Sequence, residues 1–129
     1  MIDNVVLNVP RQRAMELTHK LEDLWRRDVN SYSGHLKNMG VYQNLDGTII
    51  HGSLAKFLNS ENITPLTRVQ IEIAIRKLEE DTGLDLSTAI IRGLEFGVSI
   101  ITKEKPSEYF KLFGYPAVFT RQEYSKAVV

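Results

Sequence analysis

The sequence has 129 residues, enough for one hydrophobic core but too few for two, and its 43% hydrophobic and 25% charged residues are typical of a folded, water-soluble domain. Sixteen basic and sixteen acidic residues cancel, so no overall field attracts nucleic acid and any DNA contact must be local. The absence of cysteine excludes disulfides, thiolate metal sites and cysteine nucleophiles, and it favours a reducing compartment.

No stretch approaches the roughly eighteen apolar residues of a membrane span, and the first residues lack the basic and apolar regions of a signal peptide. We therefore expect a cytoplasmic protein without membrane contact. Residues 1–129 are expected to form a single domain, with a core over about 1–102 and an extension over 103–129.

The first part of the chain predicts a strand and then a long helix. Polar and apolar residues alternate over residues 2–9, and Pro10 ends this strand. Over residues 11–28 apolar residues recur at spacings of three and four, which predicts an amphipathic helix. The apolar positions are Ala14, Leu17, Leu21, Leu24 and Trp25.

The middle of the chain predicts a hairpin and a second helix. Strand-like runs over 35–42 and 48–58 are separated by Asn-Leu-Asp-Gly at 44–47, which is a good hairpin signal. Either Thr64-Pro65 or Thr67 with Gln70, which form a capping-box pattern, is expected to cap the second helix, which ends near Gly83. Its expected apolar stripe consists of Leu66, Val69, Ile73, Ala74 and Leu78.

The last strand is expected over residues 87–102, with a short helix over 106–112 after it. Its even positions are apolar: Ile90, Leu94, Phe96, Val98 and Ile100. Its odd positions are Gly93, Glu95, Gly97 and Ser99, which places a carboxylate between two glycines on the less apolar face.

The predicted order is therefore that of an α+β, ferredoxin-like β-α-β-β-α-β fold with an antiparallel sheet, plus the short C-terminal helix. Both long helices are expected on one face of four strands, which leaves the other face available for a ligand, nucleic acid or a partner. Because many unrelated proteins share this topology, the fold alone implies no function.

Two sets of residues are candidates for metal chemistry. Glycines beside Glu95 would let a metal ion or a phosphate approach its carboxylate, although a bulge with a lysine-paired glutamate explains the same pattern. Among the histidines, His19, His35 and His51, the expected hairpin places His51 opposite Gly40, several residues from His35 along the ladder. This register argues against histidine ligation.

Several segments in the chain recur together in one known family. They are Met1-Ile2-Asp3, Tyr32-Ser33-Gly34-His35-Leu36-Lys37-Asn38, Gly52-Ser53-Leu54-Ala55-Lys56-Phe57 with Asn59, Leu66-Thr67-Arg68 leading into Ala74-Ile75-Arg76-Lys77-Leu78, and Leu94-Glu95-Phe96-Gly97-Val98 followed by Pro106 and Tyr109. By their order and spacing, these segments resemble the N-terminal region of phage and plasmid replication initiators similar to the gene II protein of filamentous phages. The likeness covers about residues 1–115.

This resemblance implies a ferredoxin-like rolling-circle initiator that binds origin DNA and nicks one strand through a tyrosine with a divalent metal ion. It implies that Glu95 matches an acidic strand position, a candidate metal ligand, and that Lys56 matches a lysine of the Gly-Ser-x-x-Lys segment. The sequence departs from the pattern at Gly93, where arginine is common, and no tyrosine can be assigned as nucleophile. We expect a partial form without a complete nicking site.

The leading hypothesis is a DNA-interacting domain that uses the open sheet face near Glu95 and Lys56, with Lys37 at its margin. Phe57 is expected in the core. The rival from another class is a non-catalytic interaction module that forms a homodimer through its free sheet face or edge. A metal-dependent hydrolase would need at least two more ligands near Glu95.

Overall fold

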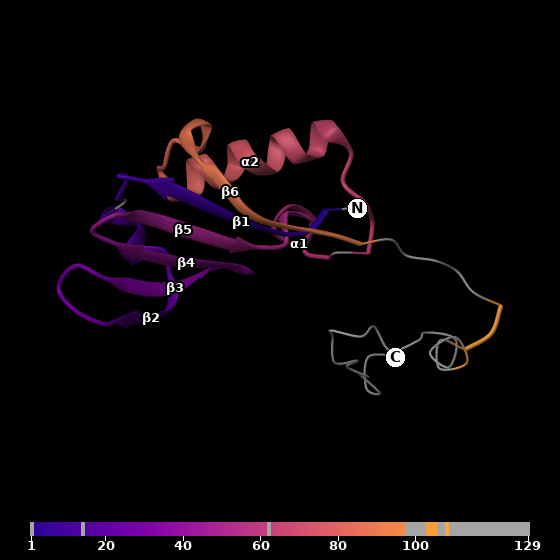
Figure 1. Cartoon of the computed structure of the whole chain (residues 1–129), viewed down its shortest axis with the longest axis horizontal. Coiled ribbons are helices and arrows are strands. Elements are labelled where there is room, and N and C mark those ends of the chain that lie inside the picture. Colours follow the sequence, from indigo (N-terminus) through magenta and orange to yellow (C-terminus); the bar gives the residue numbers. More distant parts are fainter. Residues whose placement is uncertain (1, 14, 62, 98–102, 106–107, 109–129) are drawn as a thin grey trace, which may run out of the picture. The chain divides into compact units, whose positions relative to one another are not determined.

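The computed structural model describes residues 2–13, 15–61, 63–97, 103–105 and 108 (Figure 1). The chain divides into two compact units, Met1–Val98 and Ser99–Val129. In the second unit the amide of Glu108 donates to the Lys105 carbonyl at 2.9 Å. Most of the predicted helix over 106–112 lies outside the described residues, as do Val98, Ser99 and Ile100 of the last predicted strand.

The first unit is built on one antiparallel sheet in the order β2-β3-β4-β5-β1-β6 (Figure 1). The six strands are β1 (Ile2–Pro10), β2 (Glu22–Arg26), β3 (Tyr32–Leu36), β4 (Met39–Asn44), β5 (Gly47–Gly52) and β6 (Ile90–Phe96). The predicted α+β class with an antiparallel sheet is confirmed, but the described part of the chain has two more strands than the four expected.

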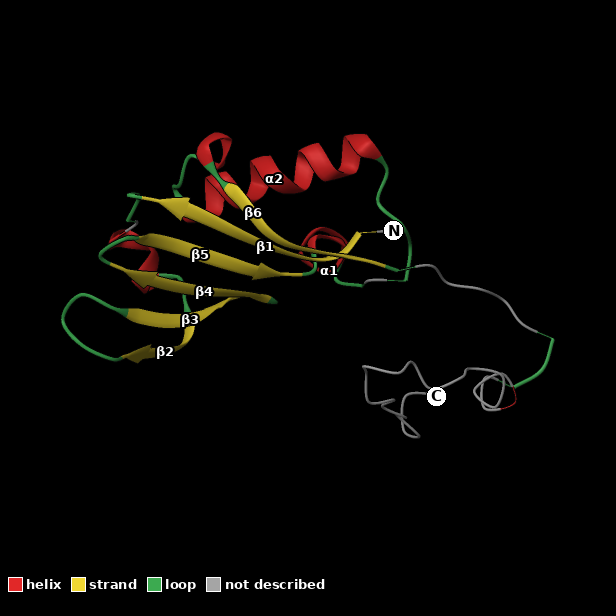
Figure 2. Ribbon diagram, in the orientation of Figure 1, coloured by secondary structure: helices red, strands yellow, loops and turns green. Residues whose placement is uncertain are grey.

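Two α-helices and two short 3₁₀ helices complete the unit (Figure 2). They are α1 (Leu54–Asn59), α2 (Arg68–Thr82), η1 (Met15–His19) and η2 (Leu86–Thr88). Helix α1 packs against α2 and β1. Within the described residues, no helix combines the length and apolar character needed to cross a membrane.

The core lies between the helices and one face of the sheet. Along β1 the side chains of Val5, Leu7 and Val9 are buried, and they meet Leu78 of α2 in a single apolar cluster. The alternate side chains lie on the other side, because successive strand residues point to opposite faces. We call this other side the open face; it carries Asn4, Val6, Asn8, Trp25, Ser33, His35, Tyr42, Ile49 and His51.

The predicted helix over residues 11–28 is wrong. The described residues of this stretch form η1 and then β2, which pairs with β3. Leu17 of the predicted stripe is fully buried and Leu21 packs against the core, whereas Leu24 and Trp25 are exposed. Apolar residues spaced by three and four are a weak signal for a helix when the edge of a neighbouring strand can bond the same backbone. Here residues 22–26 pair with β3 instead of forming a helix.

Both predicted middle strands are shorter than expected. The turn at Leu45 and Asp46 is confirmed, since Asn44 pairs with Gly47. The Asn44 side-chain oxygen accepts from the Asp46 amide at 2.8 Å and from the Gly47 amide at 3.2 Å. The first run, however, is divided into β3 and β4 by a turn in which Lys37 has a φ of 55°. The second run ends at Gly52, and a helix follows it.

Helix α1 begins where the sequence analysis predicted a continuing strand. Ser53 is its N-cap, and the Ser53 hydroxyl accepts from the Lys56 amide at 3.2 Å. The cap satisfies a free amide of the first turn and fixes the start of the helix. Leu54, Ala55 and Phe57 are buried on the inner side of this helix, so the expectation that Phe57 belongs to the core is confirmed.

Helix α2 is capped at Thr67, one of its two predicted starts, and ends at Gly83 as predicted. The Thr67 and Gln70 capping box is present, and Gly83 adopts the left-handed conformation that ends the helix. The predicted apolar stripe is only partly right: Ala74 and Leu78 are buried, but Val69 is 63% and Ile73 49% exposed. Ile71, Ile75 and Thr82 complete the side of the helix that faces the core.

Strand β6 begins at Ile90 rather than at residue 87 and breaks the predicted alternation. A register shift at Arg92 places Ile90 opposite Asn8 but Leu94 opposite Val5, so these two even-numbered residues lie on different faces. The ferredoxin-like order is not confirmed. The described part of the chain has one long helix where two were expected on one face, and β2 and β3 extend the sheet.

Candidate functional site

The open face carries a row of aromatic side chains. In the ladders, Trp25 of β2 lies opposite Ser33 of β3, and Ser33 lies opposite Tyr42 of β4. Directly paired residues share a face, so the two rings flank a small serine on one surface. Trp25 is 58% exposed and Tyr42 is partly exposed. Such rings on an exposed sheet suit stacking against flat ligands.

A second row crosses the same face and contains two histidines. His35 of β3 and His51 of β5 both pair with Gly40 of β4, and Glu22 of β2 pairs with His35. The prediction that His51 lies opposite Gly40 is confirmed. The conclusion that His35 lies several residues away along the ladder is wrong, because the turn at 37–38 places His35 on the other side of the same glycine.

An open hollow of about 550 Å³ lies at the end of the sheet where the β2–β3 loop meets the β4–β5 turn. Arg27 and Tyr42 both line it, so a cationic residue and an aromatic residue share one hollow. The backbone amide of Asn30, which donates to the Asp28 carboxylate at 2.7 Å, lowers the pKa of Asp28. The Asp28 carboxylate therefore stabilises the β2–β3 loop.

Tyr32 and Tyr42 lie on opposite faces of the sheet, with Tyr42 on the open face. Tyr32 is buried on the core side, its hydroxyl donates to Gln43 at 2.8 Å, and burial raises the pKa of Tyr32. A buried tyrosine usually bonds its hydroxyl in this way, so the contact is structural. Tyr109, Tyr115 and Tyr124 lie outside the described residues.

Glu95 lies on β6, and its carboxylate is hydrogen-bonded to the side-chain amide of Asn4 on β1. The Asn4 side-chain amide donates to the Glu95 carboxylate at 2.6 Å, and Glu95 is exposed. Over the described residues, no three His, Asp, Glu or Cys side chains gather as metal ligands. The donor set therefore gives no support to a metal ion held by Glu95 through protein ligands alone, and among the described side chains it lacks the further ligands that a hydrolase would need.

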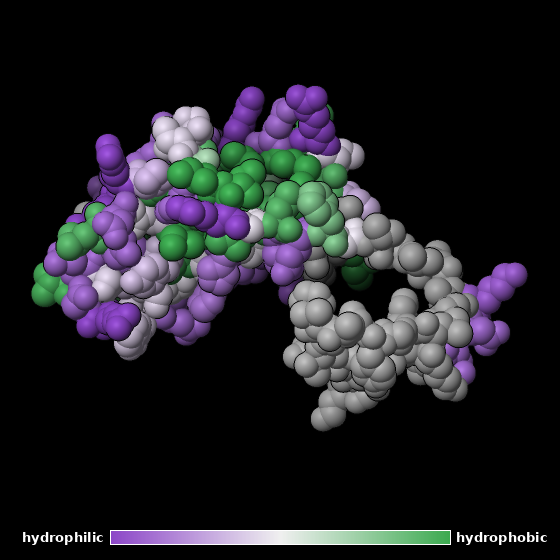
Figure 3. All heavy atoms as spheres, in the orientation of Figure 1, coloured by the Kyte–Doolittle hydropathy of each residue, from purple (hydrophilic) through white to green (hydrophobic). Residues whose placement is uncertain are grey.

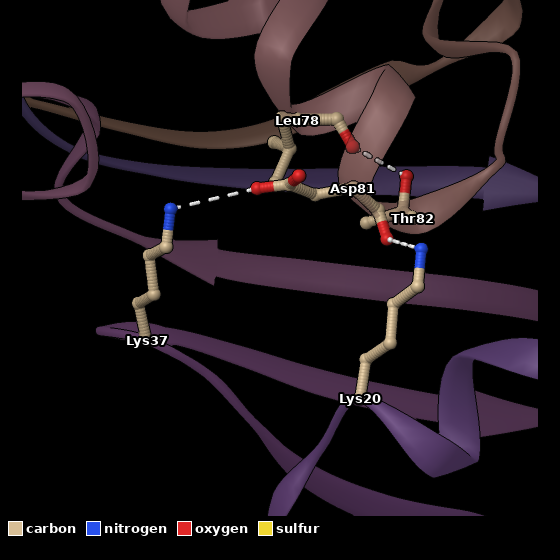
Figure 4. A network of polar contacts seen from close by, with 5 residues as sticks. All are labelled: Lys20, Lys37, Leu78, Asp81 and Thr82. Carbon is tan, nitrogen blue, oxygen red and sulfur yellow. Dashed lines mark hydrogen bonds and ion pairs between the residues drawn. The ribbon is translucent and has the colours of Figure 1, made fainter.

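Lys37 contacts the helix layer. Its ammonium lies 3.6 Å from the Asp81 carboxylate of α2 (Figure 4). The same ammonium lies 4.9 Å from the centre of the Phe57 ring. Lys20 donates to the Asp81 backbone carbonyl at 3.1 Å, so two lysines converge on the end of the same helix. These contacts give Lys37 a structural role.

Lys56 lies in the first turn of α1, not on a strand as predicted, and its side chain is exposed. The three residues singled out from the sequence thus sit on three different elements: Lys37 in the β3–β4 turn, Lys56 on α1 and Glu95 on β6. The described structure does not gather them into one site.

Two segments on which the sequence resemblance rests pack against each other. The Asn38 side chain donates to the Ser53 carbonyl at 2.9 Å. Gly52 has a φ of 148°, and a Cβ there would lie 2.9 Å from both the Asn38 carbonyl oxygen and the Met39 sulfur. Local packing therefore accounts for several of these residues without invoking a ligand.

Sequence reasoning missed the aromatic row because Trp25 was placed on a helix. Part of this row could have been found by dividing the predicted strand into β3 and β4. Ser33 and Tyr42 then pair with each other and share a face of the sheet. No pattern in the sequence fixes the β2–β3 register, which contains a shift between Glu22 and Trp25.

Comparison with known proteins adds nothing further, since no family model, no curated protein and no solved structure matches this chain.

Proposed function

We propose that this chain is a DNA-interacting domain of a phage or plasmid rolling-circle replication initiator and that it binds single-stranded DNA on its open face. The sequence resemblance supplies the class of protein. The exposed Trp25 ring, in one row with Tyr42, is the observation that carries the assignment to this face. Strand nicking is not proposed for these residues.

Stacking supplies the first part of the binding energy. Bases of any sequence present flat faces, and one base stacked on an aromatic side chain contributes about 1–3 kcal/mol. Ser33 separates the two rings, so bases can approach without a bulky side chain between them. A single strand suits this surface, because its bases are free to leave the helical stack.

Phosphate contacts must supply the second part, and they must be local because the net charge is zero. Arg27 lines the hollow beside Tyr42 and is exposed. A strand whose base stacks on the aromatic row can thus place its phosphate near this guanidinium. We assign Arg27 this role in place of Lys37, whose ammonium is paired with Asp81.

We infer in addition that the sheet is a variant of the ferredoxin-like arrangement. Strands β6, β1, β5 and β4 are neighbours in that order, and the segment containing α2 connects β5 to β6. The order supports a core of β-α-β-β-α-β type in which η1, β2 and β3 take the place of the first helix. In this interpretation Trp25 belongs to the inserted hairpin.

Fluorescence anisotropy with a labelled single-stranded oligonucleotide tests the function. Trp25→Ala should weaken binding by about 1–3 kcal/mol. Phe96→Ala is the matched control, since Phe96 is a similarly exposed aromatic at 73% but lies on edge strand β6, away from the aromatic row. Equal loss in both variants, or no binding by the unmodified chain at low ionic strength, contradicts the proposal.

The second candidate is a non-catalytic module that forms a homodimer. It is favoured by apolar side chains on β6, which Figure 3 shows as a green area where this strand lies. Ile91 is 62% and Phe96 73% exposed, beside Leu94 at 38%. Light scattering over a range of concentrations separates the candidates: a dimer lost in Phe96→Ala but kept in Trp25→Ala favours the module.

A further inference from the structure

Gly40 lies between two histidines on the open face. His35 pairs with it from β3 and His51 pairs with it from β5, so the three residues form one row across adjacent strands. Since neighbouring strands are about 4.8 Å apart, the two histidine backbones are about 10 Å apart across the sheet. The residue between them has no side chain.

The His51 ring already occupies the space above this glycine. A Cβ built on Gly40 would meet three atoms of the imidazole, Nε2, Cε1 and Cδ2, the last at 3.1 Å. His51 therefore reaches one full strand spacing towards β3. His35 starts one strand spacing from Gly40 on the other side, so an equal reach towards β5 would bring its imidazole beside the His51 ring.

We infer that His35 and His51 form a binding site for a transition-metal ion above Gly40. Both side chains are exposed, and within the described part of the chain neither has a hydrogen-bond or ion-pair partner that would hold it elsewhere. Imidazole nitrogen is a preferred ligand of Zn²⁺, Ni²⁺ and Cu²⁺. The ion takes one nitrogen from each ring.

The remaining coordination positions stay open. No third His, Asp or Glu side chain of the described residues joins the pair as a ligand group. Water or a phosphate oxygen completes the coordination, as in metal sites that keep exchangeable positions. Glu22, opposite His35 on β2, is placed to accept the other N–H of that imidazole, the usual outer partner of a ligating histidine.

The site does not depend on DNA binding. The metal site uses the row of His35, Gly40 and His51, whereas the stacking surface uses Trp25 and Tyr42. A failure to bind metal therefore does not contradict the proposed DNA binding, and a failure to bind DNA does not contradict the metal site. If both exist, the ion and its open positions lie on the same face as the aromatic row, where a bound strand presents phosphates.

Isothermal titration of the full chain, without a histidine tag, with ZnCl₂ and NiCl₂ tests the site. We expect one ion per chain, and at least about tenfold weaker binding in either His35→Ala or His51→Ala. His19→Ala is the matched control, because His19 is exposed on η1 outside the row. Absence of binding, or equal loss in His19→Ala, overturns the inference.

Gly40→Ala separates geometry from ligand loss. This variant keeps both histidines but fills the space that the His51 ring occupies. The flexible ring can swing away, so the fold should persist, which circular dichroism checks. We expect the same tenfold or greater loss of metal affinity. Unchanged affinity in a folded Gly40→Ala protein shows that the rings do not meet over the glycine and overturns the site.

Discussion

The ammonium of Lys37 lies 3.6 Å from the Asp81 carboxylate, and this ion pair joins the β3–β4 turn to the last turn of α2. Lys20 reaches the Asp81 carbonyl at the same helix end (Figure 4). Cations suit this position because the free carbonyls at a helix C-terminus carry partial negative charge. The two lysines thus tie the sheet side of the unit to its long helix.

Asp81→Asn should lower the free energy of unfolding by at most about 1 kcal/mol, because the paired side chains are 50% and 34% exposed and solvent screens them. The loss should shrink at high salt. Urea denaturation at two salt concentrations measures both effects. Glu72→Gln breaks the more exposed Arg68–Glu72 pair and serves as control. A larger loss in Glu72→Gln than in Asp81→Asn contradicts the structural role.

Replacing Gly52 by alanine should destabilise the chain more than replacing Gly83. Both have positive φ, 148° and 70°, but a Cβ at Gly83 meets nothing within 4 Å. Gly83→Ala should therefore cost about 1–2 kcal/mol of backbone strain. Gly52→Ala adds contacts with Asn38 and Met39 to a strain of roughly 1–3 kcal/mol.

Thermal or urea unfolding of the two glycine variants gives the comparison directly. If Gly83→Ala is the more destabilised protein, then the close packing of the β3–β4 turn against Gly52 is not as described.

Acid should destabilise the fold through loop carboxylates. Hydrogen bonds from the Ser87 hydroxyl and then from the Ser87 amide lower the pKa of Asp85, and the amide of Asn30 lowers that of Asp28. A carboxyl whose folded pKa is lowered contributes stability that is complete above its unfolded pKa of about 3.9 and is lost as pH falls through the folded value.

Urea denaturation between about pH 5 and pH 2 should show this decline in the free energy of unfolding. Asp85→Asn should flatten it, because the neutral amide keeps an acceptor for Ser87 but does not titrate. An unchanged pH dependence in the variant would contradict the assignment.

The elements that the sequence predicted correctly carry short-range signals. The Asn44–Gly47 turn, the Thr67 cap and the Gly83 end all depend on residues within a few positions of one another. The turn and the Gly83 end occur as predicted, and the Thr67 cap is one of the two starts that the sequence offered for α2. Ser53 gave a similar signal for α1, but the apolar run around it favoured a strand. Local chemistry was thus sufficient wherever it was not competing with an apolar pattern.

The elements that were missed depend on distant pairing. Residues 22–26 have helical periodicity but form β2 because β3 offers an edge, and no local pattern reveals this. The histidine row followed from two registers meeting at Gly40, of which only one was predicted. Glu95, by contrast, was placed correctly on the last strand, although its partner Asn4 is 91 residues away.

The most direct measurement uses Trp25 itself, the only tryptophan of the chain. Its intrinsic fluorescence reports from the proposed stacking surface alone. Titration with single-stranded DNA at low salt should quench this emission to saturation, and added salt should reverse the change as phosphate contacts weaken. An emission spectrum that stays constant in excess oligonucleotide would show that DNA does not bind on the open face.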